Sequence, residues 1–484
     1  MINAARRVLQ WCALLALAGC SSIVHKPLSA SAATVHKIAI FFDGTHNDIA
    51  SDTNIKRLHS LVSLQGQRDI SSIYIEGVGV GNDVIGMGAG VGMKPRVVIA
   101  YEFILNHYRP NDEIHIFGFS RGAYAARILA SMLYNAGVVE KHDLANSAVA
   151  DMTSFEMANA VYDVFKYRLR EDEEHTRKRD VRAALETMGF KVTGPISVEV
   201  LGLWDTVEAM GIPEWPSRIS HKAGIRQHIA NIDASNTRYG DQLCNVKRAY
   251  QALSIDDDRE WIFTPLLLDR AHLFRHCAAD GKHLLDTDGL IRPGRLRQVW
   301  FSGAHSDVGG GNADSLLSGV SLNWMIDNLK GDKWGDNQNG AGLLPADAQV
   351  AADPFGTSHD PEAGWWGPLY HAINRDIATY VTTTAPTQTG NLQRWEWRRK
   401  EFGNSLCVHR SVLDRRVAVP LRSDENQSLA LRKSGEVMLE AEPPKHDGWK
   451  PRLREMKKLN ADDLPANPLK LVVEVWPDCK GMNR

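Results

Sequence analysis

The stretch Glu113–Gly122, EIHIFGFSRG, decides the fold class that this sequence predicts. Glu113–Phe119 is short and largely apolar, as in a buried strand, whereas the segment from Arg121 to about Ala136 is rich in Ala, Leu and Met, as in a helix. Between them, G-x-S-x-G permits the tight strand-to-helix turn of a nucleophile elbow, with Ser120 at its tip. The pentapeptide alone would also fit a helix that Ser120 merely caps. Its position between a strand and a helix favours the elbow.

The same alternation of strands and helices extends along the chain. Alternating elements build a mostly parallel sheet with helices on both faces, so we expect an α/β fold of the α/β-hydrolase type. The highly charged stretch Tyr162–Met188 predicts a solvated helical insertion that could form a lid. We assign 37–422 to the catalytic domain and 423–484 to a C-terminal extension with a strand-like segment at Leu469–Trp476. Further strands are expected at Lys37–Phe42, Ser72–Ile75, Ser197–Leu203 and Gln298–Phe301, and a helix at Val97–Tyr108.

A catalytic serine requires a base to take its proton and an acid to orient that base. In an open α/β sheet such groups follow the carboxyl ends of strands, as Asp205 does in LGLWDTV and His305 in VWFSGAHSDVGGG. The order Ser120, Asp205, His305 is the α/β-hydrolase order of nucleophile, acid and base, so we expect a triad. Alternatively, Asp205 caps a turn and His305 is structural, and Asp307 is the main rival acid. The rival bases lack the strand-end context; they are His276, His283, His371 and His409.

The turn FFDGTHND after the first strand is a candidate oxyanion hole. The backbone amides around Gly44 and Thr45, together with that of Arg121, could stabilise a tetrahedral intermediate, with Asp43 orienting the loop. The letters also resemble the D-x-D-G-T loop of haloacid-dehalogenase-type phosphatases. That interpretation fails because the position of the nucleophilic aspartate is occupied by Phe41.

Charge and composition argue against several other classes. A formal net charge of -2 gives no electrostatic reason to expect a nucleic-acid partner. The Gly-rich stretch Gly77–Gly92 lacks a G-K-[ST] ending and predicts a flexible loop without phosphate. His272, His276, Cys277 and His283 lie close in sequence but match no metal-binding pattern. We therefore expect neither a cofactor nor a metal.

The first residues have the composition of a secretory leader. Basic residues precede the apolar run Val8–Ala18, which is too short to span a bilayer comfortably. The run ends in LAGC, which resembles a bacterial lipobox, so we expect a signal peptide at 1–19, lipidation of Cys20 and a tether at 20–36. The alternative is an ordinary leader in which Cys20 is incidental. Because no acidic retention signal follows, we expect a lipoprotein of the outer membrane that faces the periplasm.

Four cysteines remain outside the leader and the lipobox. In an oxidising compartment they allow a disulfide, but their number and spacing neither form a disulfide scaffold nor reveal the pairing. These residues are Cys244, Cys277, Cys407 and Cys479.

Six blocks, FFDGTHND, GFSRGAYAAR, LGLWDTV, AYQALSIDDDR, FSGAHSDVGGG and VHRSVLDRR, together resemble the α/β-hydrolase domain of type VI secretion lipase effectors and their relatives. The likeness extends from about Lys37 to about Arg422. It implies a triad of Ser120, Asp205 and His305 and hydrolysis of phospholipid acyl esters, with membrane lipid as the substrate. The lipobox departs from injected effectors, and no inhibitor or immunity protein is identified. The alternative is a lipoprotein whose hydrolase fold is a binding or assembly module without turnover.

Overall fold

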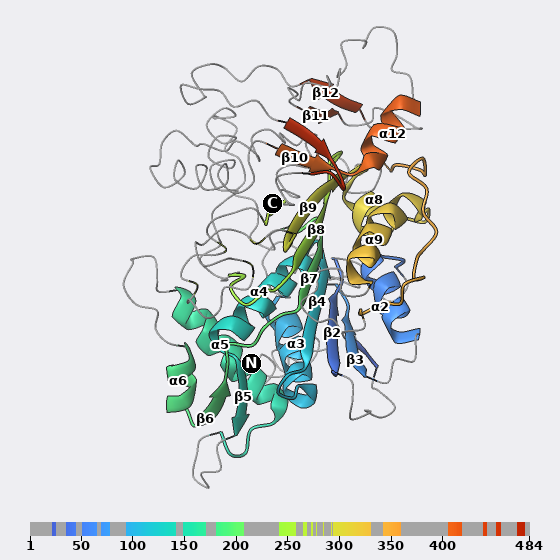
Figure 1. Cartoon of the computed structure of the whole chain (residues 1–484). Helices are drawn as coiled ribbons and strands as arrows, with labels where there is room; N and C mark the ends of the chain where they lie inside the picture. Colours follow the sequence, from blue (N-terminus) through green and yellow to red (C-terminus); the bar gives the residue numbers. More distant parts are fainter. Residues whose placement is uncertain are drawn as a thin grey trace, which may run out of the picture.

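The computed structural model of the chain is centred on a nine-stranded sheet (Figure 1). The strand order is β1-β3-β2-β4-β7-β8-β9-β10-β13, and all neighbouring pairs are parallel except β1 and β3. The predicted mostly parallel α/β-hydrolase-type sheet is therefore confirmed. The bounds are β1 Ser22–His25, β2 Lys37–Phe42, β3 Ile70–Ile75, β4 Glu113–Phe119, β7 Val200–Trp204, β8 Ala249–Ser254, β9 Leu296–Phe301, β10 Ser405–Val408 and β13 Val472–Val475.

The structure describes residues 22–25, 35–44, 51–64, 69–77, 93–141, 149–170, 181–207, 242–257, 265–268, 273, 277, 284, 292, 294–330, 342–359, 405–418, 439–442, 452–455 and 472–479. The predicted leader, Cys20, Thr45 and the loop beyond Gly77 lie outside these residues. None of the described helices combines the length and the apolar composition needed to cross a membrane.

The register of the central strands brings their carboxyl ends to one edge of the sheet. Phe42 of β2 is paired with Gly118 of β4, which places the residues that follow β2 beside the elbow. Phe119 is in turn paired with Trp204 of β7. Parallel strands in register deliver the residues after them to a common edge, and this edge carries the candidate site.

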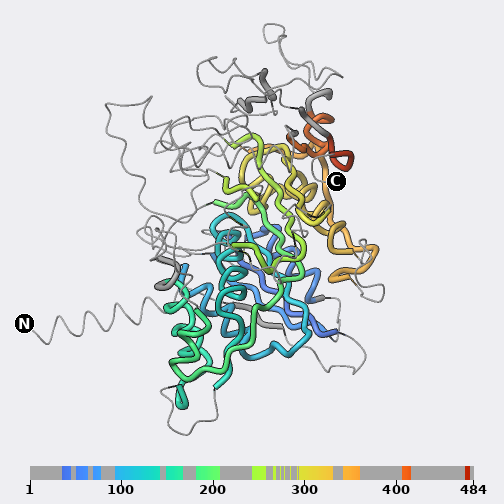
Figure 2. The backbone as a smooth tube through the Cα atoms, turned by 60° about the vertical axis from the view of Figure 1, so that its left-hand side comes forward, coloured from blue at the N-terminus to red at the C-terminus, as the bar shows by residue number. Residues whose placement is uncertain are grey.

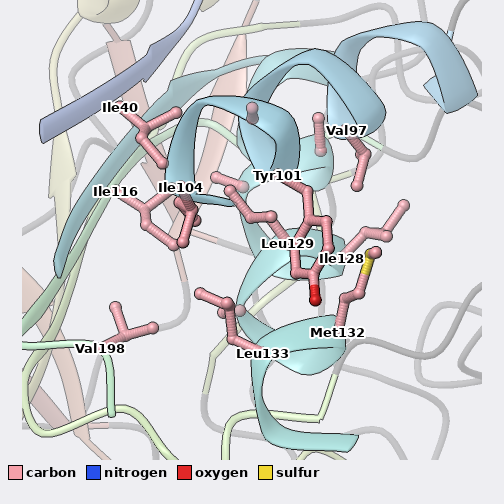
Figure 3. Close-up of a cluster of buried hydrophobic side chains, with 14 of the residues drawn as sticks. Ile40, Val97, Tyr101, Ile104, Ile116, Ile128, Leu129, Met132, Leu133 and Val198 are labelled. Atoms are coloured by element: carbon pink, nitrogen blue, oxygen red, sulfur yellow. The ribbon is translucent and has the colours of Figure 1, made fainter. Parts of the chain in front are cut away.

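Helices cover both faces of the sheet and enclose two apolar cores. On one face, α3 (Met93–His107) and α4 (Arg121–Asn135) direct apolar side chains at alternate residues of the strands, such as Ile40 and Ile116 (Figure 3). On the other face, α2 (Asn54–Leu64) lies beside α9 (Leu316–Leu329) and covers the intervening residues, such as Phe41 (Figure 1). This alternation of burial is the period-two pattern of a sheet with both faces covered.

The predicted charged insertion is helical but not wholly solvated. The helices of this region are α5 (Ser154–Arg170) and α6 (Val181–Thr187). In the chain they lie between β5 (Val138–Lys141) and β6 (Phe190–Thr193), which pair with each other as a two-stranded antiparallel sheet. Helix α5 packs against α3 and buries Tyr162 in the first core. The expectation of a solvated insertion is wrong for this face, because the charged residues mask an apolar stripe on the same helix.

Both margins of the sheet use chain segments that were expected to lie outside the catalytic domain. Four residues of the predicted tether form β1, which pairs antiparallel with β3. At the other end, β13 of the C-terminal extension pairs in parallel with β10. In Figure 1 the red C-terminal strand lies toward the upper end of the sheet and the blue strands β2 and β3 toward its lower end, and in Figure 2 the red segment again lies above the blue ones. The extension also contains the hairpin β11 (Leu439–Glu442) and β12 (Arg452–Glu455).

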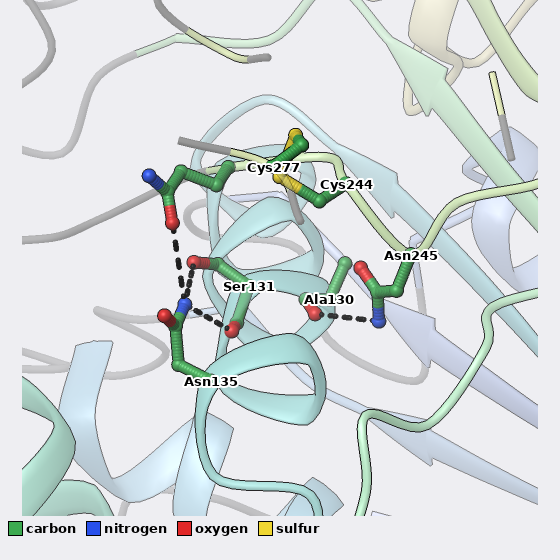
Figure 4. Close-up of a disulfide and its surroundings, with 7 residues drawn as sticks. Ala130, Ser131, Asn135, Cys244, Asn245 and Cys277 are labelled. Atoms are coloured by element: carbon green, nitrogen blue, oxygen red, sulfur yellow. Dashed lines mark hydrogen bonds between the residues drawn. A yellow bond between two sulfur atoms is a disulfide. The ribbon is translucent and has the colours of Figure 1, made fainter. Parts of the chain in front are cut away.

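Two disulfides join the four remaining cysteines. Cys407 of β10 is bonded to Cys479, which lies just beyond β13. Cys244 is bonded to Cys277 beside α4, where the neighbouring Asn245 side chain donates to the Ala130 carbonyl at 3.0 Å (Figure 4). The Cys407–Cys479 bond therefore joins β10 to the residues after β13 at the margin of the sheet. The Cys244–Cys277 bond joins two loop segments beside α4.

Candidate active site

Ser120 lies at the tip of a strained turn between β4 and α4. Its φ of 56° and ψ of -127° are uncommon for a residue other than glycine. A Cβ at Gly118 would lie 2.5 Å from Ala123 Cα, and a Cβ at Gly122 would lie 2.4 Å from the Asp43 carbonyl oxygen. Only glycine fits at these two positions, because neighbouring backbone atoms occupy the space that a Cβ would need. This is the physical basis of the G-x-S-x-G pattern. The Ser120 hydroxyl makes no side-chain capping bond to the helix.

Asp205 follows β7 directly and contacts His305. Asp205 Oδ2 accepts a hydrogen bond from His305 Nδ1 at 2.5 Å, and Asp205 Oδ1 accepts the Ser254 backbone N–H at 3.0 Å. The carboxylate is fully buried, and the residue has a positive φ of 36°. A buried carboxylate with a neighbouring amide and an imidazole is held in one orientation, so it fixes the ring that it contacts.

His305 begins α8 (His305–Gly309), just after β9, and lies against the elbow. Its ring packs against the ring of Phe119, the residue before Ser120, with 4.7 Å between the centroids. The Ser120 amide donates to the Trp204 carbonyl at 3.0 Å, one residue before Asp205. The three residues predicted as a triad thus follow β4, β7 and β9 at the same edge of the sheet, and two of them, Asp205 and His305, are in direct contact.

Two further carboxylates hold the turn that carries His305. Asp256 Oδ2 accepts the Gly303 amide at 2.6 Å, and Asp257 Oδ2 accepts the His305 amide at 3.0 Å. Both aspartates are buried. They were not among the predicted site residues, although they form an acidic run directly after the strand Ala249–Ser254.

The Asp43 side chain holds the turn after β2 and accepts the hydrogen bond of the Gly44 amide. Its Oδ1 accepts the Gly44 N–H at 2.6 Å, while Oδ2 accepts the hydroxyls of Thr53 at 2.5 Å and Tyr74 at 2.6 Å. Arg96 donates to the Asp43 carbonyl. Burial raises the pKa of Asp43 to about 6. The expectation that Asp43 orients this loop fits the geometry, but the Gly44 amide points to the carboxylate and not to an acyl oxygen.

Of the other two predicted oxyanion-hole donors, Thr45 lies outside the described residues. Arg121 is the first residue of α4. The amide of a first helical residue lies outside the intrahelical ladder and points along the positive end of the helix dipole. The position of Arg121 is therefore compatible with stabilising negative charge next to Ser120.

The described rivals have other partners. Asp307 Oδ1 accepts a hydrogen bond from His359 Nδ1 at 2.6 Å, not from His305. His409 Nδ1 lies 2.9 Å from Ser411 Oγ, and burial lowers the pKa of His409 to about 4. His276, His283, His371 and His272 lie outside the described residues. Within the described part of the chain, no group of three or more His, Cys, Asp or Glu side chains could hold a metal ion.

Comparison with known families agrees with this architecture. Residues 36–328 match the family described as the catalytic domain of Tle1-like phospholipase effectors of the type VI secretion system. The chain belongs to this family. The matched Tle1-like region contains Ser120, Asp205 and His305, and it ends before β10.

Individual relatives are distant. An uncharacterized protein of Saccharomyces cerevisiae is 25% identical over 241 residues, which are 44% of this chain and 33% of the yeast protein; the chain thus spans about a third of that relative. The crystal structure of an uncharacterized protein from Pseudomonas aeruginosa is 18% identical in sequence, with a TM-score of 0.33, over 61% of this chain and 45% of that chain. The Tle1 effector bound to the VgrG spike is 19% identical, with a TM-score of 0.27, over 60% and 52%. The propionate-bound Thermogutta terrifontis esterase Est2 is 14% identical, with a TM-score of 0.28, over 64% and 88%.

Proposed function

We propose that this protein is a serine esterase that hydrolyses acyl esters of membrane phospholipids. The observation that carries the proposal is the 2.5 Å contact between Asp205 and His305 beside the elbow that presents Ser120. Membership of a family of phospholipase effector domains supports lipid esters as the substrate class.

In the proposed reaction, Ser120 Oγ attacks the ester carbonyl while His305 Nε2 takes its proton. Asp205 keeps Nδ1 protonated and stabilises the imidazolium that forms. Collapse of the tetrahedral intermediate releases the alcohol, which receives the proton from His305, and leaves an acyl-serine. Water then attacks the acyl-serine by the same proton transfers and releases the fatty acid. Each step balances without a cofactor or a metal.

The Arg121 amide is the proposed oxyanion donor that the described residues support best. It follows Ser120 at the start of α4, so it adjoins the carbon that the serine attacks. The Gly44 amide donates to the Asp43 carboxylate at 2.6 Å, so it could stabilise an oxyanion only after this hydrogen bond breaks. Thr45 stays a sequence prediction.

We further propose that the protein is a lipoprotein of the bacterial envelope, anchored through Cys20. The lipobox-like LAGC supports this location, and a tether would confine the enzyme to the surface that holds its substrate.

The experiment is activity-based labelling combined with lipid hydrolysis. Purified protein without its leader is treated with a fluorophosphonate probe, which reacts with an activated serine, and is incubated with phosphatidylethanolamine or phosphatidylglycerol liposomes. We expect labelling and fatty-acid release, measured by mass spectrometry, from wild type and from Ser154→Ala, a control serine at the start of α5. Ser120→Ala should lose both, with hydrolysis falling by roughly 10⁴-fold or more.

The outcomes separate the candidate functions. An unlabelled wild-type protein would support a hydrolase fold that acts as a binding or assembly module. Cleavage of short soluble esters with phospholipids left intact would indicate a general esterase. Turnover of Ser120→Ala at the wild-type rate would overturn the nucleophile assignment.

A further inference from the structure

A second aspartate–histidine pair, Asp307 and His359, has its aspartate on the same short helix as His305. The buried carboxylate of Asp307 accepts five hydrogen bonds. Two come from its own neighbourhood, from the Ala304 amide at 3.0 Å and the Asn312 side chain at 2.8 Å. The others come from a segment about fifty residues away, which we call the strap and define as Asp353–His359. Asp307 therefore joins α8 to the strap.

His359 makes the strongest part of this junction. Its Nδ1 donates to Asp307 Oδ1 at 2.6 Å and its backbone amide donates to Asp307 Oδ2 at 3.0 Å, while the hydroxyl of Ser358 adds a bond of 3.1 Å. The His359 side chain keeps 31% of its surface exposed, whereas that of Asp307 is almost fully buried. A hydrogen bond between an imidazolium and a buried carboxylate is stronger than one between neutral groups, so the charge of His359 affects the junction.

The strap is also attached elsewhere, and one such bond runs from the Asp353 amide to the Leu316 carbonyl of α9 at 3.0 Å. The guanidinium of Arg415, on α12 (Arg410–Ala418), donates to the carbonyls of Pro354 at 2.6 Å and Gly356 at 2.7 Å. Asp314, before α9, accepts the Thr357 amide at 3.3 Å. The strap is thus bonded to α9, to the residue Asp314 before it, to α12 and to α8, and among these bonds the ones to Asp307 lead directly to the helix of His305.

A shift of Asp307 can move His305, because both residues lie on α8 and this helix is short and tightly packed. The helix has five residues and begins with His305. A Cβ at Gly303 would lie 2.4 Å from Asp307 Cβ, and a Cβ at Gly309 would lie 2.0 Å from the ring of Phe119. Because Phe119 also contacts the His305 ring, we expect a displacement of Asp307 to move that ring.

We propose that His359 is a positioning residue that, by holding Asp307, keeps α8 and the His305 ring in register with Asp205. This inference rests on the proposed function, since it assigns a role to the position of His305. His359 acts through Asp307 and is not itself expected to touch the substrate.

The charges around His359 predict a direction with pH. The charged groups that act on it are Asp307 on α8 and Asp314 before α9, and Arg415 on α12 interacts electrostatically with Asp307. The bond to Asp307 raises the pKa of His359 above its ordinary value. The stabilisation from the charged pair is fully present below the unfolded pKa and is lost as pH rises through the higher folded pKa. The junction should therefore be tightest in mildly acidic solution.

The test compares His359→Ala with His359→Asn on a soluble ester across pH. Asparagine places an amide donor near the position of Nδ1 but does not titrate, so it should retain most of the turnover and remove the contribution of His359 to the pH profile. Alanine should lower kcat by roughly ten- to hundredfold with KM nearly unchanged, because it lets the catalytic groups shift by a fraction of an ångström. The matched control is His107→Asn at the end of α3, which should behave as wild type.

The outcomes distinguish this proposal from the proposed function. Equal kcat and equal pH profiles for wild type and His359→Ala, in protein that labels with the fluorophosphonate, would overturn the positioning role alone. If wild type does not label, the imidazole nitrogens of His359 are titrated by NMR in wild type and in Asp307→Asn. A lower pKa of His359 in Asp307→Asn supports the charged junction, and an unchanged pKa overturns it.

Discussion

Asp257 accepts the backbone amide of His305 at 3.0 Å, so the histidine is held through its main chain as well as through its ring. Replacing Asp257 with Ala would leave a buried amide without this acceptor and loosen the turn before α8. We expect kcat for a soluble ester to fall by roughly tenfold or more, with Asp257→Asn falling less because its amide oxygen can still accept. Steady-state kinetics, with near-UV circular dichroism to verify folding, measure the effect. Equal kcat for Asp257→Ala and wild type would show that the ring contact suffices.

The close approach of Gly122 to the turn after β2 predicts a large loss of stability on substitution. In Gly122→Ala the new methyl group would lie 2.4 Å from the carbonyl oxygens of Phe42 and Asp43, both of which belong to the backbone. Either the elbow or the turn must move, and we expect the free energy of unfolding to fall by about 3 kcal/mol or more. Urea denaturation measures this change, with Ser154→Ala as the control. A midpoint equal to that of wild type would mean that the two backbones are farther apart than the structure places them.

The buried carboxylate of Asp43 predicts a dependence of stability on pH. Its pKa is raised from 3.8 to about 6 by burial, so Asp43 binds a proton more readily in the folded state than in the unfolded state. The contribution of Asp43 to stability is therefore fully present below pH 3.8 and is lost as pH rises through about 6. Over this window it amounts to roughly 3 kcal/mol.

Asp43→Asn removes the titration and provides the comparison. The difference in the free energy of unfolding between wild type and Asp43→Asn should change between pH 4 and pH 7 in the direction that disfavours the wild type at higher pH. Chemical denaturation at several pH values measures it. A difference that does not vary with pH would mean that Asp43 stays in one protonation state throughout.

The lipobox-like segment predicts the location of the protein. Cys20→Ala should abolish incorporation of labelled palmitate and release the protein from the membrane fraction, because the acyl chains are the proposed anchor. Cell fractionation and metabolic labelling test this prediction. Retention of the variant in membranes washed with high salt would reveal a different attachment.

Much of the architecture followed from local patterns, because hydrophobic runs and the glycines of the elbow act over a few residues. The expected strand Glu113–Phe119 has the same bounds as β4, and the strand-end rule selected Asp205 and His305, which the structure brings together. The acidic run after β8 signalled a possible role for Asp256, but its bond to the Gly303 amide depends on how two strands and their turns align in three dimensions, which local patterns do not specify.

Other features were missed because a short apolar run does not specify its partner. The segment Leu469–Trp476 was recognised as strand-like, but nothing in its residues indicates that β13 completes the main sheet beside β10. The Gly44 amide looked available as a donor because the preceding aspartate was expected to orient the loop, not to accept from it. Side chains that hydrogen-bond to their own turn compete with any ligand for the same amide.

The late position of β13 in the sequence has a consequence for biosynthesis. The strands that precede the proposed catalytic residues are synthesised well before residues 472–475. The edge of β10 therefore stays unpaired until β13 has been synthesised. An unpaired edge strand is a template for pairing with another chain, and a nascent or truncated polypeptide would expose it. Closure of the Cys407–Cys479 bond then requires an oxidant after synthesis has passed Cys479, so cells that lack oxidising conditions should accumulate chains whose outer strand is paired and packed but not covalently joined to β10.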